Sequence, residues 1–176
     1  LAARYPHRVS RLTIVGGFAD GTQTGGSSII NSLLRSDGYA SYALQSIFQM
    51  WTSSRLTFEA GLGTVIGRSP GVWKNKNFRQ MNEHVRQDLL KSDPVQLIRV
   101  GQWLKKQKIT DQLSQVKIPT LVVAGREDPV VPFAHQRTMA AVMPRGRLSQ
   151  FADVGHIPMI ERPIPFCSTV DSSFQY

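Results

Sequence analysis

Three residues of this chain have side chains and an order along the sequence that suit hydrolytic chemistry: Ser69, Asp128 and His156. Ser69 lies in the sequence Gly-Arg-Ser-Pro-Gly at 67–71, which matches the G-x-S-x-G pattern that presents an attacking serine on a sharp turn. A histidine that is oriented by a carboxylate can take the proton of such a serine or of a water molecule. The first question is therefore whether Ser69 is a nucleophile.

The residue after Ser69 argues against this role. The backbone N–H that follows a nucleophile donates to the oxyanion, and Pro70 has no N–H. Loss of one such donor typically lowers the rate by about 10²–10³-fold. Pro70 also favours extended backbone at Ser69, whereas the turn needs a strained conformation. We therefore expect that Ser69 is not the nucleophile, although the preceding GLGTVI has the composition of a strand. The segment GGSSI at 25–29 is a poorer match, because it lacks the final glycine.

Asp128 and His156 each follow a short apolar segment that predicts a buried strand. Asp128 comes three residues after TLVVAG at 120–125, and His156 comes shortly after RLSQFA at 147–152. Neighbouring parallel strands lie about 4.8 Å apart, and ligands bind beyond their carboxyl ends. We therefore expect the two side chains to touch, with the carboxylate of Asp128 fixing the tautomer of His156.

The rest of the chain predicts an α/β fold with three parallel strands flanked by helices. The first strand is expected at 11–17, because RLTIVGG is apolar, β-branched and ends in glycine. Helical segments are expected at 1–9, ending near Tyr5-Pro6, and at 39–52, 78–90, 94–106 (capped by Asp93) and 132–143. Residues 20–114 are expected to form a helical cap or lid, and 1–19 with 115–176 the sheet-containing part. The predicted apolar stripes are Tyr39, Ala43, Ile47, Met50 and Trp51 in one helix, and Phe78, Met81, Val85 and Leu89 in another.

Three segments of the chain, in their order along the sequence, resemble the C-terminal part of proteins of the α/β-hydrolase fold family. LAARYPHRVSRLTIVGG is similar to the helix after the nucleophile elbow and the following strand, IPTLVVAGREDPVVP to the acid segment, and RLSQFADVGHIPMIERP to the histidine segment. The resemblance implies that Asp128 is the acid and His156 the base of a triad. Glu127 is the second candidate for the acid, and Asp153 is interpreted as a residue at the end of a strand.

The resemblance also places the nucleophile elbow upstream of Leu1, so that Ser69 falls in the cap. It implies a hydrolase, of a carboxylic ester or a related acyl bond, that needs an N-terminal half carrying the nucleophile. The chain starts with Leu rather than Met, which we interpret as processing or as part of a longer protein. The expected substrate is a small molecule, an anionic or apolar ester. Neither a metal nor an organic cofactor is implied.

Two other functions stay open at this point. The nucleophile of such a fold can be an aspartate, which gives a dehalogenase or an epoxide hydrolase, and Tyr39 and Tyr42 would then be candidate proton donors. The chain can also be a non-catalytic binding module with a cationic cap. Weaker candidates for the walls of a substrate pocket are Phe18, Trp51, Val130 and Ile157.

Composition narrows the class of protein. The net charge is +9, and residues 55–108 alone contain eleven Lys or Arg against four Asp or Glu, a net +7 that would attract anionic partners. No aromatic residues alternate with these charges as in a nucleic-acid platform, so we expect no nucleic-acid partner. No apolar run reaches the about 18 residues of a membrane helix. The single Cys167 excludes an internal disulfide and leaves the redox compartment open.

Overall fold

The structure is a computed structural model that describes residues 1–25, 28–36, 38–68 and 71–173. Within these residues, three parallel strands form one sheet in the order β1 (Leu12–Val15), β2 (Thr120–Gly125) and β3 (Gly146–Phe151). Leu12 of β1 pairs with Thr120 of β2, which pairs with Gly146 of β3. The predicted α/β class, the parallel direction and the position of each strand are confirmed.

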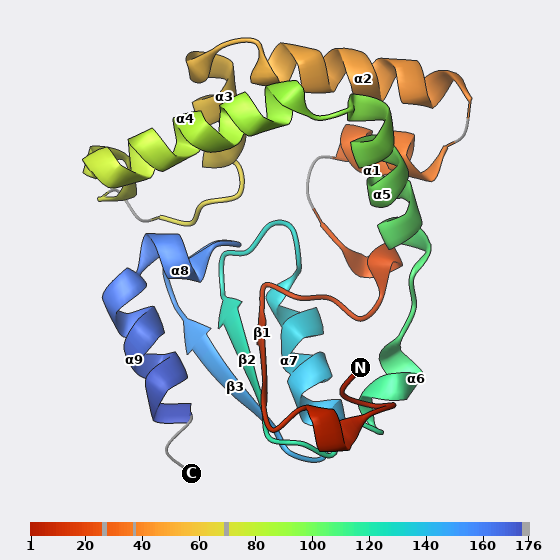
Figure 1. The fold of residues 1–176 in the computed structure, drawn as a ribbon, viewed down its shortest axis with the longest axis vertical. Coiled ribbons are helices and arrows are strands. Elements are labelled where there is room, and N and C mark those ends of the chain that lie inside the picture. The colour runs from red at the N-terminus through yellow and green to blue at the C-terminus, as the bar shows by residue number, and fades with distance from the viewer. Residues whose placement is uncertain (26–27, 37, 69–70, 174–176) are drawn as a thin grey trace.

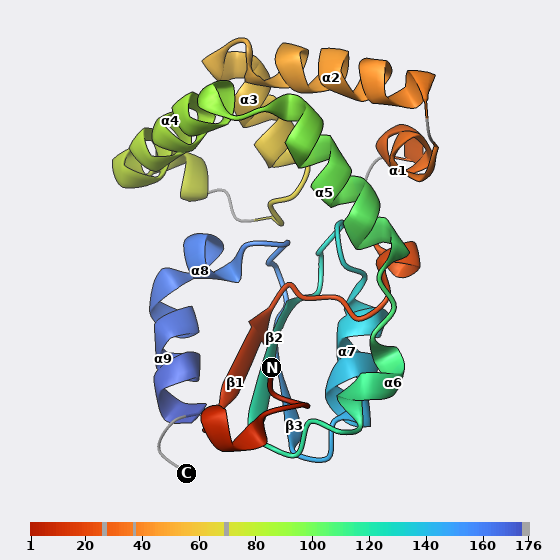
Figure 2. The same cartoon turned by 45° about the vertical axis from the view of Figure 1, so that its right-hand side comes forward.

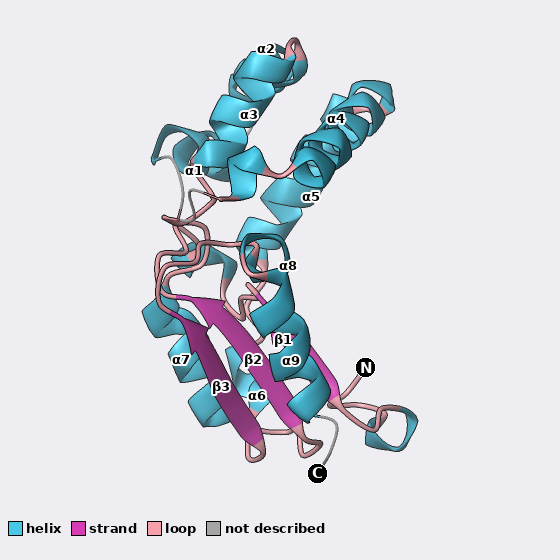
Figure 3. Ribbon diagram, turned by 90° about the vertical axis from the view of Figure 1, so that its left-hand side faces the viewer, coloured by secondary structure: helices cyan, strands magenta, loops and turns pink. Residues whose placement is uncertain are grey.

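The position of β2 at the centre of the sheet explains its largely apolar sequence. Every residue of β2 is buried, whereas β1 and β3 are only partly buried. Helices cover both faces of the sheet, α7 (Phe133–Val142) on one side and α9 (Pro163–Ser173) on the other (Figures 1 and 3). A parallel strand between two helical layers has no solvent-facing side, so it contains no alternating polar residues. The core cluster on the α7 side consists of Ala19, Leu113, Val116, Val122, Met139, Ala140 and Met143.

A layer of helices lies beyond the carboxyl ends of the strands, where the arrowheads point in Figure 2. We call α1 to α5 with their connections the helical layer. Its helices are α1 (Ser28–Arg35), α2 (Tyr39–Thr52), α3 (Arg55–Gly63), α4 (Lys76–Lys91) and α5 (Pro94–Lys106). The chain returns to the sheet through α6 (Thr110–Leu113), and α8 (Pro158–Glu161) precedes α9. Short 3-10 helices lie at Pro6–Arg8, Gly21–Gln23 and Val72–Lys74.

Local capping signals set where two of these helices begin. The side chain of Asp93 accepts a hydrogen bond from the N–H of Val95, and Pro94 takes the first position of α5, as predicted. Ser54 and Thr57 form a reciprocal capping box at the start of α3, a helix that was not predicted. This helix was not expected because Gly61 and Gly63 lie in it, and glycine disfavours a helix interior.

The expectation of a helix at residues 1–9 is wrong. Residues 1–9 contain a turn, in which the carbonyl of Leu1 accepts from Arg4 and Tyr5, and then a 3-10 turn rather than an α-helix. Pro6 lacks the N–H that a continuing helix needs. The segment GLGTVI is not a strand either, because α3 extends to Gly63.

The predicted apolar stripes of α2 and α4 are also wrong in part. Tyr39 is 91% exposed and Met50 is exposed, while α2 buries Leu44 and Thr52 instead. In α4 the buried residues are Phe78 and Asn82, and Met81 and Val85 are exposed. These helices pack against one another rather than against one continuous core, so their neighbours decide which face is buried. None of the described helices combines the length and the hydropathy that crossing a membrane requires.

Candidate active site

The structure brings Asp128 and His156 together beyond the carboxyl ends of β2 and β3. Nδ1 of His156 lies 3.0 Å from Oδ2 of Asp128. The side chain of Asp128 is 0% exposed, and that of His156 is 29% exposed. The expected contact is therefore present, and one member of the pair is sealed from water while the other still reaches the surface.

Asp128 has three further hydrogen-bond partners. Oδ1 accepts hydrogen bonds from the N–H groups of Val130 at 2.8 Å and Val131 at 2.9 Å, and Oδ2 also accepts from Nε2 of Gln136 at 3.0 Å. All three of these partners are donors, and an ionised carboxylate can only accept hydrogen bonds. The Nδ1 atom of His156 must therefore be the donor, which leaves Nε2 unprotonated in the neutral ring. This is the tautomer that a general base needs.

Gln136 is a member of this site that the sequence analysis missed. It is fully buried in α7, and its Nε2 also donates to the carbonyl of Val131 at 2.9 Å. Pro132 occupies the N-cap position of α7, and Gln136 follows near the start of that helix, within hydrogen-bond reach of Asp128. The sequence places Gln136 near the start of a helix that begins shortly after Asp128. This position indicates a hydrogen-bond partner for Asp128 only when the direction of the helix is known.

The end of β1 forms one wall beside the imidazole ring. Gly16 has a φ of +55°, which side chains rarely tolerate, and its N–H donates to the carbonyl of Val123. A Cβ atom at Gly16 would lie 3.0 Å from both Cε1 and Nδ1 of His156. Only glycine therefore lets the backbone approach the ring this closely, and all three strands contribute to the site.

The other acidic residues near the site have different partners. The carboxylate of Glu127, the second candidate for the acid, accepts from the N–H of Arg68 at 2.9 Å and lies 3.6 Å from the Arg68 side chain. Asp153 is exposed and lies 3.9 Å from the guanidinium of Arg162. The geometry therefore favours Asp128 over Glu127 as the partner of the histidine.

The four candidate wall residues fall in different surroundings. Trp51 stacks on Phe58 inside the helical layer, with ring centroids 4.9 Å apart, so its contacts are those of packing. Phe18 lies in the loop after β1. Val130 follows the acid and Ile157 follows the histidine, and both lie beside the Asp128–His156 pair along the chain. Their role in binding stays a prediction.

Two further expectations concern candidate nucleophiles and proton donors. Ser69 and Pro70 lie outside the described residues. Tyr39 and Tyr42 are exposed on α2, and Figures 1 and 2 place α2 on the side of the helical layer away from the sheet. This position gives no support to a role for either tyrosine beside His156.

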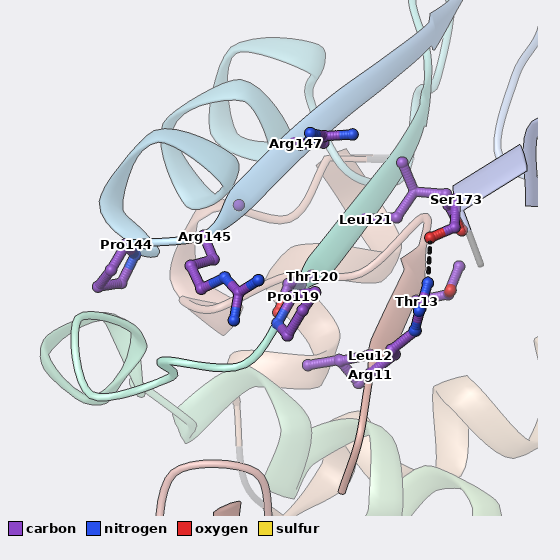
Figure 4. Close-up of a pocket in the computed structure, with 11 residues that line it drawn as sticks. Arg11, Leu12, Thr13, Pro119, Thr120, Leu121, Pro144, Arg145, Arg147 and Ser173 are labelled. Atoms are coloured by element: carbon purple, nitrogen blue, oxygen red, sulfur yellow. Dashed lines mark hydrogen bonds between the residues drawn. The ribbon is translucent and has the colours of Figure 1, made fainter. Parts of the chain in front are cut away.

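The described residues hold no cluster of three or more His, Cys, Asp or Glu side chains suited to a metal ion. A cavity of about 370 Å³ lies at the opposite end of the sheet from His156, around the starts of the strands (Figure 4). Arg11 crosses this region, and its Nη1 donates to the carbonyl of Ser173 at 2.7 Å. The chemistry of the Asp128–His156 pair, rather than this cavity, marks the candidate active site.

The fold defines a parallel α/β protein with a hydrogen-bonded aspartate–histidine pair beyond its strand ends. The profile of the α/β hydrolase fold family matches residues 1–163, and the chain belongs to this family. The predicted family is therefore confirmed.

The relatives include proteins named as an esterase, a lipase and putative carbamate hydrolases. The chain is 31% identical over 91 residues to the pimeloyl-[acyl-carrier protein] methyl ester esterase of Nitrosomonas europaea. This match covers 50% of this chain and 36% of that protein. It is 24% identical over 178 residues to Lipase 1 of Psychrobacter immobilis, covering 88% of this chain and 56% of that protein.

Solved structures agree with the fold. An α/β hydrolase from a Medee basin deep-sea metagenome library, MGS-M2, superimposes with a TM-score of 0.71 at 17% identity, over 99% of this chain and 59% of that one. The enol-lactonase of Burkholderia xenovorans LB400 gives a TM-score of 0.64 at 18% identity, over 100% of this chain and 60% of that one. The chain thus spans about three fifths of the length of these structures, and its match covers 36% of the esterase and 56% of the lipase.

Proposed function

We propose that this chain supplies the acid and the base of a hydrolase that cleaves carboxylic esters or related acyl bonds. The observation that carries the proposal is the 3.0 Å contact between Oδ2 of Asp128 and Nδ1 of His156, which leaves Nε2 as the proton acceptor. The names of the esterase and lipase relatives support the reaction class.

The proposed reaction runs through a covalent intermediate. His156 takes the proton of the nucleophile as the nucleophile bonds to the acyl carbon, and it then gives this proton to the departing alcohol. In the second half His156 takes a proton from water, whose oxygen bonds to the acyl carbon and releases the acid. The nucleophile recovers its proton from His156. Asp128 orients the ring and stabilises the imidazolium in both halves.

We further propose that the nucleophile comes from an N-terminal half, present in a longer polypeptide or in a separate one. The length of the relatives supports this, because the match covers only part of each. The sheet supports it too: β1 pairs with β2 on one side only, and no described strand pairs with its other edge. We propose that the helical layer serves as the cap over a small-molecule ester bound beside His156, with Val130 and Ile157 as candidate wall residues.

Hydrolysis of chromogenic short- and medium-chain esters tests this proposal, with this chain and with the longest available polypeptide that contains it. We expect activity in the longer polypeptide that falls by about 10⁴-fold in Asp128→Asn and at least as far in His156→Ala. Asp153→Asn is the matched control, because it removes a carboxylate that is exposed and outside the pair. We expect the control to retain its activity.

Two results would contradict the proposal. Activity of this chain alone that is lost in Ser69→Ala would place the nucleophile in the chain. Salt-dependent binding to anionic polymers, with no turnover by either polypeptide, would favour a cationic binding module, for which the net +7 of residues 55–108 is the supporting feature.

A further inference from the structure

A second buried carboxylate lies next to the histidine, and the reaction proposed above does not use it. Glu161 is only 6% exposed, although it ends the short helix α8. Its carboxylate accepts from the N–H of Gly155 at 2.9 and 3.1 Å, from the N–H of Gly67 at 2.8 Å and from the N–H of Ile157 at 3.4 Å. No Lys or Arg of the described chain pairs with it. Backbone N–H groups alone therefore stabilise this buried charge, which would otherwise be very costly.

These hydrogen bonds join two segments that are far apart in the sequence. Gly155 and Ile157 flank His156, whereas Gly67 belongs to the helical layer and is the first glycine of the G-x-S-x-G pattern. A Cβ atom at Gly67 would lie 2.6 Å from the N atom of Gly155, and a Cβ atom at Gly155 would lie 2.5 Å from the N atom of Gly67. Both positions need glycine because the two backbones are in direct contact where their N–H groups bind the carboxylate of Glu161.

The histidine is attached to the same junction through its own backbone. The N–H of His156 donates to the carbonyl of Val65 at 2.8 Å. The backbone is thus held before, at and after His156, by Glu161 at Gly155 and Ile157 and by Val65 in between. With the backbone fixed in this way, few side-chain torsions remain, and the ring is directed at Asp128.

We propose that Glu161 is a positioning residue, whose buried carboxylate binds the N–H groups of Gly155 and Gly67 and thereby aims Nδ1 of His156 at Asp128. The inference rests on the proposed function only for the use of His156 as a base, since the geometry itself concerns the chain alone. It also gives the first glycine of the G-x-S-x-G pattern a role other than nucleophile presentation.

The test is NMR spectroscopy of this chain, comparing Glu161→Gln with the unmodified protein. The glutamine keeps the volume but turns an NH₂ group toward N–H donors and removes the charge. We expect hydrogen exchange at the Gly155 and Gly67 amides to become at least about tenfold faster, and the Nδ1 proton signal of His156 to broaden or disappear. Amides of the central strand, such as Val122, are expected to exchange as before, which shows that the sheet is intact.

Two variants separate positioning from general loss of charge. Glu161→Asp keeps the charge on a side chain one methylene shorter, and we expect partial recovery of the Nδ1 signal. Glu127→Gln is the matched control, because Glu127 holds the neighbouring N–H of Arg68 but none of the residues around His156. We expect it to leave the Gly155 amide and the Nδ1 signal unchanged.

The inference is overturned if Glu161→Gln leaves both signals unchanged, or if Glu127→Gln has the same effect. If Glu161→Gln does not fold, Glu161→Asp decides, because it keeps the charge and shortens the reach to the N–H groups of Gly155 and Gly67. A broadened Nδ1 signal with faster exchange of these two amides supports the role of Glu161, and an unchanged Nδ1 signal rejects it. Absence of ester hydrolysis in the longer polypeptide would refute the proposed function without changing any of these signals.

Discussion

At the scale of single residues, the carboxylate of Asp128 accepts hydrogen bonds from four donors. Three of them are uncharged and fixed, so they hold the acid in place before the histidine ring is considered. Of these three, only Gln136 competes with His156 for the same oxygen, Oδ2. Its Oε1 has no hydrogen-bond partner among the described residues, so Gln136 also carries an unsatisfied buried acceptor.

We predict that Gln136→Met lowers the unfolding free energy by about 1–2 kcal/mol, because two buried donor bonds are lost while one unsatisfied acceptor is removed. The Nδ1 proton of His156 is expected to move downfield in the NMR spectrum, since Oδ2 then has a single donor. Denaturant unfolding and the proton spectrum measure the two effects. In Gln136→Glu, a second carboxylate faces Asp128, and stability at neutral pH should fall further than in Gln136→Met. A Gln136→Met protein with full stability and an unmoved Nδ1 signal would show that this contact has no energetic role.

At the scale of helices and strands, Arg86 of α4 forms an ion pair with Glu83 on its own helix and a hydrogen bond to the end of α2. Glu83 accepts from Nη2 of Arg86 at 2.6 Å and from Nε at 3.0 Å, and Nη1 of Arg86 donates to the carbonyl of Thr52 at 2.9 Å. The hydrogen bonds from Arg86, and next the one from Gln87, lower the pKa of Glu83 to about 2. A carboxylate with a lowered pKa in the folded state contributes stability above its unfolded pKa of about 4.5. This contribution is lost as the pH falls toward 2.

We predict that Glu83→Gln lowers Tm modestly at pH 7 and has a decreasing effect as the pH falls from 4.5 to 2. The effect is modest because the Glu83 side chain is 32% exposed and water screens the pair. Thermal unfolding at several pH values measures it. Asp88→Asn is the control on the same helix, since Asp88 is largely exposed and lies 3.7 Å from Lys91. Equal effects of the two substitutions at every pH would assign the loss to charge alone rather than to the α2–α4 contact.

The same scale shows what the sequence predicted and what it did not. The strands were predictable because burial on both faces leaves an apolar run such as TLVVAG, and α2, α4, α5 and α7 because helical periodicity or capping residues mark them. The helix α9 was missed because Pro163 and Pro165 suggest a break, yet both lie in the first turn, where the missing N–H groups have no helical partner. The Asp128–His156 contact followed from strand order. Gln136 and Glu161 did not, because their contacts depend on helix direction and on backbone contacts between distant segments.

At the scale of the whole molecule, the free edge of β1 decides how the chain behaves alone. The N–H groups of Leu12 and Gly16 donate to the carbonyls of Pro119 and Val123 in the direction of β2. Because alternate residues of a strand point to opposite sides, Thr13 and Val15 direct their N–H groups to the edge that no described strand covers. Such an edge is a template for pairing with another chain.

We predict that the purified chain self-associates as its concentration rises, and that Thr13→Pro weakens this association by about tenfold, because proline removes an outward N–H and blocks a partner strand. Sedimentation velocity over a range of concentrations measures it. Ile14→Pro is the matched control, since it breaks the ladder to β2 and is expected to unfold the sheet instead. A longer polypeptide that supplies the next strand should be monomeric and more stable. If the unmodified chain is monomeric at every concentration, unfolds cooperatively and binds no dye for exposed apolar surface, then β1 needs no further strand and the proposed N-terminal half is refuted.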